Sequence, residues 1–469
     1  MSAGLLVTGG EVDGERVDVR CGDGVVAEVG PGLVARPGET VVRGAAVALP
    51  GLHDHHLHLM AMAAADISVD VGPDAAPDRD GLRQVLRAAT AGLARGAWLR
   101  AVGYRAPPGA WVDRWDLDAM VADRPVRVQH RAGHLWILNS AACDVLGLDD
   151  EPSGAVERDG DGRPTGRLID GDHLLAARLP RGDPPDLAGV SRRLASYGVT
   201  GVTDATPTVT AADLEVLARA CREGALVQRV RVMGTVEAAG PGIPAGLEAG
   251  PVKVMVSDGP DPDPDGLARR IDAAHRAGRP VALHCASRVA AVLALVAWDA
   301  VGPAPGDRME HGAVLPDDLA ERLATLGVTV VTQPAFLVDR GDAYLDEVAP
   351  DDLDCLYRCA GLERAGVALG GGTDAPFGPE DPWVAVGAAV RRRTRSGRVI
   401  GPAERLAPRR ALALFLADAG SPGGPVRTVR PGAPADLCLL DGDPLRDPGG
   451  PQAARVVAAV AGGRLVHEV

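Results

Sequence analysis

The chain has 469 residues, of which 46% are hydrophobic, so it is long enough to bury a large core. Its net charge of −14 argues against binding to nucleic acid or to an anionic membrane surface, because such binding needs a basic face. There is no run of 18 apolar residues, the first ten residues do not resemble a signal peptide, and seven scattered cysteines without a Cys-x-x-Cys pair favour a reducing cytoplasm.

Both ends of the chain contain short apolar and β-branched runs separated by glycine and proline, which is typical of β-strands joined by turns. The strands are expected at residues 5–7, 16–21, 25–29 and 40–48, and then at 435–440, 455–460 and 464–466. Residues 1–50 and 425–469 are therefore predicted to form one composite β-sandwich domain.

Between these ends, residues 51–424 alternate between strand and helix patterns, which is typical of a parallel sheet with crossover helices. With a first strand near 45–50, eight strands are expected, the number that closes a TIM-like (β/α)8 barrel. The other seven strands are expected at 199–205, 227–234, 252–257, 280–285, 307–311, 328–334 and 367–374. The helices are expected at 187–197, 211–224, 264–277, 287–300, 315–327, 351–366 and 380–394.

The connection after the first strand is far longer than the connections that usually join a strand to the next helix. The segment from about 60 to 186 is therefore predicted to be an inserted subdomain of the barrel. Within it, the residue pattern predicts a helix at 81–95 and strands at 98–104 and 125–130.

A histidine-rich stretch follows the first expected strand, which breaks at Pro50 and Gly51. Strand side chains alternate between two faces, so His56 and His58 project to the same side and can hold one metal ion, whereas His53 and His55 have the other parity. A solvated histidine-rich loop would explain the same residues. We favour a metal pair, because histidine is the commonest metal ligand.

The chain contains a single lysine, Lys253, among 49 basic residues. All the other basic residues are arginine, so arginine is used wherever only a positive charge is required. A buried lysine can lose its proton, which arginine cannot do, so a position that kept lysine is a candidate for chemistry. The alternative is that Lys253 is an ordinary surface residue. A position at an active site that needs a lysine would argue against this alternative.

Active sites of α/β barrels lie at the carboxyl ends of the strands. The expected strand ends carry His56 with His58, then Lys253, His284, His311 and Asp374. Each residue taken singly has an ordinary explanation, such as a rim histidine or a turn aspartate. Five strands of one expected barrel that all end in such groups are hard to attribute to chance.

With these residues in place, the sequence resembles the amidohydrolase superfamily, and within it the family 3 branch of YtcJ-like metal-dependent hydrolases. The resemblance spans nearly the whole chain. The motifs that carry it are Pro-Gly-x-x-Asp-x-His-x-His (50–58), Gly-His-x-x-x-x-Asn-Ser (133–140), Gly-x-Pro-x-Gly (162–166), Gly-Val-Thr-Gly-Val-Thr-Asp (198–204), Val-Lys-x-x-x-x-Asp-Gly (252–259), the His284 strand, Glu-His-Gly (310–312), Thr-Gln-Pro (332–334), Gly-Thr-Asp-Ala-Pro (372–376) and Pro-Gly-x-x-Ala-Asp-Leu (431–437). The chain departs from the pattern at His53 and His55, which replace an apolar and a small residue.

The resemblance implies a role for each of these groups. His56, His58 and Asp374 would bind one divalent ion, and His284 and His311 would bind a second. Lys253 would bridge the two ions as an N-carboxylated lysine, and a mononuclear site with an unmodified lysine is the alternative. Lys253 and Asp374 are the expected catalytic residues, with Asp374 as the proton shuttle. The expected cofactor is Zn²⁺, with one or two ions per chain.

The implied activity is hydrolysis of a non-peptide, amide-type C–N bond in a small molecule by a metal-activated hydroxide. Deaminases of the superfamily usually carry His-x-x-Glu after strand 5, and this chain has no glutamate at that place in the run 284–287, which favours amide hydrolysis. An esterase or lactonase is chemically close. A non-catalytic metal-binding scaffold is a remote alternative, because all six ligand positions are kept.

Substrate contacts are expected from the insert and from the loop ends. The candidates are Tyr104, His134, Asn139 and Gln333. Trp111 and Asp258 are weaker candidates. The expected partner is a small-molecule substrate, without nucleic acid or membrane, and a homo-oligomer is compatible with the sequence.

Overall fold

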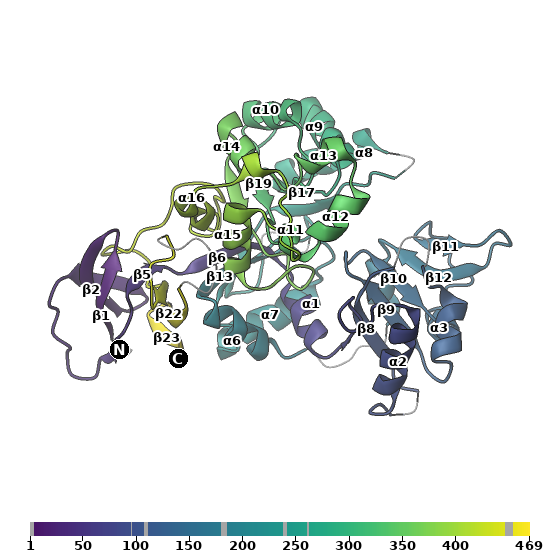
Figure 1. Cartoon of the computed structure of the whole chain (residues 1–469), viewed down its shortest axis with the longest axis horizontal. Coiled ribbons are helices and arrows are strands. Elements are labelled where there is room, and N and C mark those ends of the chain that lie inside the picture. Colours follow the sequence, from purple (N-terminus) through teal and green to yellow (C-terminus); the bar gives the residue numbers. More distant parts are fainter. Residues whose placement is uncertain are drawn as a thin grey trace. The chain divides into compact units, whose positions relative to one another are not determined.

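The computed structural model describes residues 4–94, 96–106, 111–179, 185–237, 242–259, 262–445 and 454–469. The chain divides into two compact units (Figure 1). The smaller unit is Met60–Pro185, and the larger unit combines Met1–Leu59 with Asp186–Val469. Both units mix helices and strands, so the mixed α/β class predicted from the sequence is confirmed.

Both ends of the chain contribute to one eight-stranded sheet of the larger unit. Its order is β23-β22-β21-β5-β1-β2-β3, with β4 paired to β1. The two ends meet where β5 and β21 pair in antiparallel fashion, from Pro50 opposite Leu437 to Val47 opposite Leu440. The bounds are β1 Leu5–Val12, β2 Glu15–Gly22, β3 Val25–Gly30, β4 Thr40–Val42, β5 Val47–Pro50, β21 Leu437–Leu440, β22 Val456–Ala461 and β23 Arg464–Glu468.

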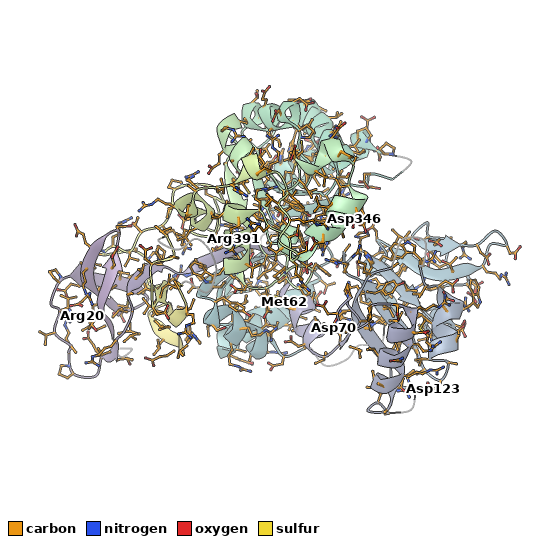
Figure 2. The ribbon with its side chains drawn as sticks, viewed as in Figure 1. Arg20, Met62, Asp70, Asp123, Asp346 and Arg391 are labelled. Carbon is orange, nitrogen blue, oxygen red and sulfur yellow. The ribbon has the colours of Figure 1, made fainter. Side chains whose placement is uncertain are left out.

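A buried arginine fixes the loop that follows β3. The side chain of Arg20, labelled in Figure 2, forms an ion pair with Glu39 at 2.8 Å and donates a hydrogen bond to the carbonyl oxygen of Val34 at 2.6 Å. The pair is worth more than an exposed one, because little water competes for either group. The loop between β3 and β4 is thereby tied to β2.

The centre of the larger unit consists of two all-parallel sheets. One has the order β15-β14-β13-β6, and the other has the order β16-β17-β18-β19-β20. All seven strands predicted after the first are confirmed, and β15 is an addition. The bounds are β6 Leu52–Leu57, β13 Val199–Asp204, β14 Arg229–Val232, β15 Leu247–Ala249, β16 Val252–Met255, β17 Val281–Cys285, β18 Arg308–His311, β19 Thr329–Thr332 and β20 Leu369–Gly371.

Backbone hydrogen bonds connect these two sheets at both sides. The amide of Asp374 donates to the carbonyl of His56 at 2.7 Å, and the amide of His58 donates to Ala375 at 2.9 Å. At the other side, the amide of Lys253 donates to Gly234, just after β14, at 2.9 Å. These hydrogen bonds place the segment after β20 beside the end of β6, and the start of β16 beside the segment after β14.

The first strand was placed wrongly from the sequence. The histidines do not follow a strand at 45–50; they lie on a separate strand, β6, or, for His58, directly after it, because β5 belongs to the terminal sheet. The chain changes sheets at Gly51, where any side chain is excluded: a Cβ atom there would lie 2.2 Å from the hydroxyl of Thr200. Proline and glycine thus mark a crossing between two sheets instead of the end of a barrel strand.

Helices pack around the central strands (Figure 1): α6 against β13, α7 against β15, and α8 and α9 against β17. In the described part of the chain, no helix combines the length and hydropathy needed to span a membrane. The helices of the larger unit are α6 Leu187–Ser196, α7 Ala211–Glu223, α8 Pro264–Arg276, α9 Arg288–Val301, α10 Asp317–Leu326, α11 Phe336–Asp339, α12 Gly341–Glu347, α13 Pro350–Leu353, α14 Ala360–Ala365, α15 Pro382–Arg391, the 3-10 turn Pro402–Glu404 and α16 Pro408–Ala413.

One predicted helix is wrong. The segment 351–366 forms the two short helices α13 and α14 instead of one continuous helix. Between them, Leu356 pairs with Val314 as an isolated β-bridge, and Tyr357 has a left-handed φ of 43°. Both side chains are buried, so packing of this linker against its neighbours overrides the helical pattern.

The smaller unit is built on a six-stranded sheet with the order β11-β12-β10-β9-β8-β7. The strands predicted at 98–104 and 125–130 are confirmed as β8 and β9, and the helix predicted at 81–95 is α2, with residue 95 outside the described residues. The bounds are α1 Leu59–Asp66, which leads into the unit, β7 Val69–Asp70, α2 Arg79–Thr90, β8 Leu99–Tyr104, α3 Arg114–Met120, β9 Val126–His130, β10 Leu135–Leu138, α4 Ser140–Leu146, β11 Val156–Arg158, β12 Pro164–Ile169 and α5 Asp172–Arg178.

Candidate metal centre

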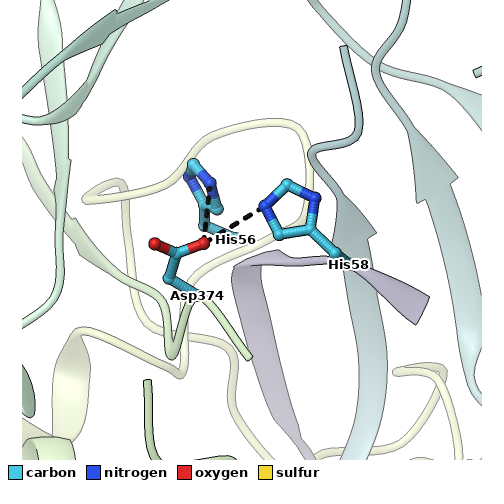
Figure 3. Close-up of side chains that lie close together, drawn as sticks. All are labelled: His56, His58 and Asp374. Atoms are coloured by element: carbon cyan, nitrogen blue, oxygen red, sulfur yellow. Dashed lines mark hydrogen bonds and ion pairs between the residues drawn. The ribbon is translucent and has the colours of Figure 1, made fainter. Parts of the chain in front are cut away.

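Three predicted ligands converge at the carboxyl ends of β6 and β20 (Figure 3). One carboxylate oxygen of Asp374 lies 3.1 Å from Nε2 of His58 and 3.6 Å from Nε2 of His56. One ligand atom from each residue lies within 4.8 Å of the others, which is close enough for all three to bind one ion. Two imidazole nitrogens and one carboxylate oxygen suit a divalent ion of borderline softness.

The local backbone brings these groups together. Asp374 has a left-handed φ of 56°, a conformation that aspartate tolerates better than most residues, and its amide is bonded to the carbonyl of His56. Gly372 lets the chain pass β6 closely, because a Cβ atom there would lie 2.6 Å from the Cβ of His56. The Gly-Gly-Thr-Asp sequence therefore places the carboxylate against strand β6.

The other three predicted ligands continue the same cluster. Nζ of Lys253 on β16 lies 3.5 Å from Nε2 of His56. The ring of His311 on β18 has its centroid 4.9 Å from that of His56, and its Nε2 lies 3.0 Å from Nδ1 of His284 on β17. His311 has a left-handed φ of 66°, which is uncommon outside glycine and is a form of backbone strain often found at functional sites.

Burial controls the charge states in the cluster. It lowers the pKa of the Lys253 ammonium, although the carboxylates of Glu310 and Asp374 act in the opposite direction. It also lowers the pKa of His311 to about 3, with a further contribution from the charge of Lys253. The pKa of His56 likewise lies well below its usual range because of burial. Both imidazoles are therefore neutral, which is the form that binds metal ions.

Asp374 is held in its charged form. Burial raises the pKa of this carboxyl group, but the hydrogen bond with His58 and electrostatic interactions with His56, His58 and Lys253 bring the pKa below its ordinary value. A buried carboxylate that stays ionised can bind a cation or accept a proton from a water molecule.

Sequence reasoning missed two further acidic residues at the centre. Glu310 is fully buried and contacts the ring of His56, and Arg308 contacts the other oxygen of Glu310. Asp54 accepts hydrogen bonds from the amide of His56 at 3.0 Å and from the hydroxyl of Thr373 at 2.6 Å, so it joins β6 to the loop after β20. Both lie inside motifs quoted above, and their position beside a ligand was the available signal.

The structure places the predicted substrate-contact residues in different surroundings. Oε1 of Gln333 lies 2.7 Å from Nδ1 of His311, so this buried side chain supports a predicted ligand. In the smaller unit, Asn139 is fully buried, caps α4, and bonds the backbone of Val121, Arg124 and Val126. These contacts use the whole amide, so Asn139 has a structural role within the smaller unit.

Tyr104 and His134, the other two candidates in the smaller unit, differ in exposure, and the weaker candidate Trp111 lies in the same unit. Tyr104 is buried, and its hydroxyl accepts a hydrogen bond from the amide of Val112 at 3.2 Å, which is a structural contact. His134 is exposed on the loop before β10. Trp111 is 42% exposed, and its ring lies 5.3 Å from that of His130. His134 and Trp111 are therefore the accessible members of this group.

The remaining histidines of β6 lie away from the metal ligands. His53 is buried, and its Nε2 lies 2.9 Å from the hydroxyl of Thr203. His55 is fully buried, and neither ring nitrogen has a hydrogen-bond partner among the residues that the structure describes. The predicted parity is confirmed, because the structure groups His56 and His58 with Asp374 and leaves His53 and His55 outside that group.

Together, the parallel strands and the His-His-Asp group provide a site with the ligands and spacing for one divalent metal ion. The model of the amidohydrolase family matches residues 44–467, and the chain belongs to that family. The resemblance stated from the motifs is therefore confirmed, and the family supports a hydrolase.

The relatives agree with this assignment. YtcJ of Bacillus subtilis, named as an amidohydrolase, is 26% identical over 92% of this chain and 90% of its own length. N-substituted formamide deformylase of Arthrobacter pascens is 26% identical over 92% of each chain. The crystal structure of an uncharacterized metal-dependent hydrolase from Pyrococcus horikoshii covers 94% of this chain and 98% of its own, with a TM-score of 0.74 at 24% identity, and shows the same fold.

Proposed function

We propose that the chain is a zinc-dependent hydrolase that cleaves a non-peptide, amide-type C–N bond in a small molecule. The observation that carries this proposal is the cluster of His56, His58 and Asp374, which Lys253, His284 and His311 extend. The relative named as a formamide deformylase supports the choice of a C–N bond.

His56, His58 and Asp374 would hold the ion, which supplies a Lewis acid and lowers the pKa of bound water. Asp374 is the proposed proton carrier. Its carboxylate is ionised and faces both imidazoles, so it accepts a proton from the attacking water and returns it to the leaving nitrogen. His58 keeps this carboxylate in place through its 3.1 Å contact.

We assign Lys253 as the group that joins a second ion, held by His284 and His311, to the first. Burial lowers the pKa of the Lys253 amine and so favours its neutral form, which can take up carbon dioxide and, after losing a proton, become an anionic carbamate. Arginine has no such reaction, which accounts for the single lysine at this position. A one-ion site with an unmodified Lys253 is the alternative.

The finer architecture belongs to the same proposal. The hydrogen bonds from Asp374 to His56 and from Lys253 to Gly234 support closure of the two parallel sheets into a (β/α)8 barrel over residues 51–424, with an insertion at about 60–186. The shared terminal sheet supports a composite sandwich from residues 1–50 and 425–469. The free cysteines support a reducing compartment, the cytoplasm.

A deaminase is the alternative on the same fold, and Ser287 argues against it. This residue occupies the place where superfamily deaminases usually have glutamate. Its hydroxyl accepts a hydrogen bond from the amide of Ala290, caps helix α9, and contacts Asp258.

Two further alternatives use the same site. Ester or lactone hydrolysis needs the same metal ligands, and a non-catalytic metal-binding scaffold needs no proton transfer by Asp374. A small molecule is the expected partner, and a homo-oligomer is compatible with it.

Assays of the purified full-length chain test this proposal. The protein is loaded with Zn²⁺ and offered N-substituted formamides, N-acyl amino acids, cyclic amides, aminopyrimidines, simple esters, lactones and proline dipeptides. We expect metal-dependent hydrolysis of one of the first three classes and little turnover of the others. Preferred turnover of dipeptides, aminopyrimidines, esters or lactones, or inactivity toward every substrate with two zinc ions bound, would contradict it.

A further inference from the structure

The inference concerns the ring nitrogen of His56 that points away from the other ligands. Nδ1 of His56 contacts one carboxylate oxygen of Glu310, and the other oxygen of Glu310 contacts Nε of Arg308. Arg308 also donates to the carbonyl of His55 at 2.8 Å. Glu310 is 0% exposed and Arg308 is 2% exposed, so water does not compete for these bonds.

The chemistry of the partners decides which nitrogen carries the proton. Arg308, which stays protonated, donates to one oxygen of Glu310 and so favours its carboxylate form; a carboxylate can only accept, so Nδ1 of His56 is the N–H donor. A neutral imidazole has one proton, and therefore Nε2 carries the lone pair. Nζ of Lys253 lies 3.5 Å from Nε2, and an N–H of either form of the amine can point at a lone pair there.

We propose that Glu310 is a positioning residue that fixes His56 in its Nδ1–H form, with Nε2 directed at the metal, and that Arg308 holds the Glu310 carboxylate in place. The inference rests on the proposed metal-dependent function. Carboxylate partners of ligating histidines fix the ring orientation and raise the basicity of the ligating nitrogen.

Two other ligands, His58 and His311, have a neutral partner at Nδ1, so the contribution of each partner can be compared with that of Glu310. Nδ1 of His311 lies 2.7 Å from the amide oxygen of Gln333, and Nδ1 of His58 lies 3.1 Å from the hydroxyl of Thr206. Hydrogen bonds to a charged group are about twice as strong as those between neutral groups. Glu310 is therefore the support whose removal should weaken metal binding most.

The first experiment uses the unmodified protein. Nitrogen-15 labelling of histidine and two-bond proton–nitrogen NMR spectra distinguish the two tautomers, and the His56→Asn variant assigns the signal. We expect His56 to show a protonated Nδ1 and an unprotonated Nε2 in the metal-free chain. A protonated Nε2 would overturn the proposal without affecting the proposed hydrolase activity, because no substrate or metal takes part.

The second experiment compares two glutamate-to-glutamine variants. Glu310→Gln should weaken Zn²⁺ binding by about ten- to a hundredfold, measured by competition with a chromophoric chelator. Hydrolysis lost at limiting zinc should return at saturating zinc. The matched control is Glu404→Gln: Glu404 is also buried and pairs with Arg358 at 3.0 Å, but its other hydrogen bonds come from the amides of Cys359 and Gly361 and not from a metal ligand.

The outcomes separate a positioning role from general stability. Weaker zinc binding in Glu310→Gln, with the control unchanged, supports the proposal. Equal zinc affinity in Glu310→Gln and the wild type, or an equal loss in the control, contradicts it. If Glu310→Gln fails to fold, the tautomer of His56 in the wild-type protein and the zinc affinity of Arg308→Lys decide the matter.

Discussion

At the residue scale, Lys253 shows how one side chain can account for a bias across the whole composition. The chain otherwise uses arginine for its basic residues, and its lysine lies buried against His56 at the centre of the predicted ligand set. Burial lowers the pKa of the amine and so favours its neutral form. A guanidinium at the same place would remain charged in every state of the enzyme.

We expect Lys253→Arg to lose metal and activity. A permanent positive charge beside His56 repels a divalent ion and cannot form a carbamate, so kcat/KM should fall roughly a hundredfold or more. Elemental analysis and substrate kinetics measure the effect, and circular dichroism should show an intact fold. A variant that keeps two ions and full activity would remove Lys253 from the bridging role.

Asp374→Asn tests the proton carrier. Asparagine tolerates the left-handed φ of 56° at this position, so the loop should keep its shape. The amide cannot accept a proton, and kcat should fall by roughly a hundredfold to ten-thousandfold while some metal is retained. Metal content and kcat are measured on the same preparation. An unchanged kcat would show that another group moves the proton.

His55→Leu should stabilise the protein. Both ring nitrogens of His55 are buried without a partner among the described residues, and an unsatisfied buried polar group costs about 1–3 kcal/mol. The free energy of unfolding in urea should therefore rise. The matched control is His53→Leu on the same strand, which should lower it, because His53 loses its contact with Thr203. A loss of stability in both variants would mean that His55 has a partner inside the fold.

At the element scale, the sequence pattern predicted most of the strands and helices: short apolar runs indicated the central strands, such as the fully buried β13, and apolar periodicity indicated the helices. It failed where packing decides. The helix predicted at 351–366 breaks at the buried Leu356, and β5 and β6 were merged because Gly51 signals a break but not a change of sheet. The ligand positions were predictable from strand ends, whereas the support of His56 by Glu310 depends on side-chain directions that sequence spacing does not give.

Gly51→Ala tests the crossing between β5 and β6. The new Cβ would lie 2.2 Å from Oγ1 of Thr200, so the strands must separate, and the free energy of unfolding should fall by about 1–3 kcal/mol. Adding Thr200→Ala removes that oxygen and should recover part of the loss in a double-mutant cycle. Gly30→Ala is the control, since nothing lies within 4 Å of its Cβ position. Equal losses in both single variants would contradict the close approach.

At the scale of the whole molecule, every predicted metal ligand lies in the larger unit, although the chain of that unit is interrupted by Met60–Pro185. His56 and His58 precede the interruption, and the other four ligands follow it. A metal centre built from these six residues would therefore join two segments of chain that the smaller unit separates in sequence. Its stabilising effect should be confined to the unit whose parts it joins.

Zinc binding should accordingly protect one unit and not the other. At a thousand times its dissociation constant, zinc would add about 4 kcal/mol to the stability of the unit that binds it. Hydrogen–deuterium exchange by mass spectrometry, with zinc and after chelation, should show slower exchange in peptides from residues 186–469 and none of this slowing in residues 60–185. The effect should disappear in His56→Ala. Equal protection of both units would mean that they unfold together, and that the smaller unit depends on the metal centre for its stability.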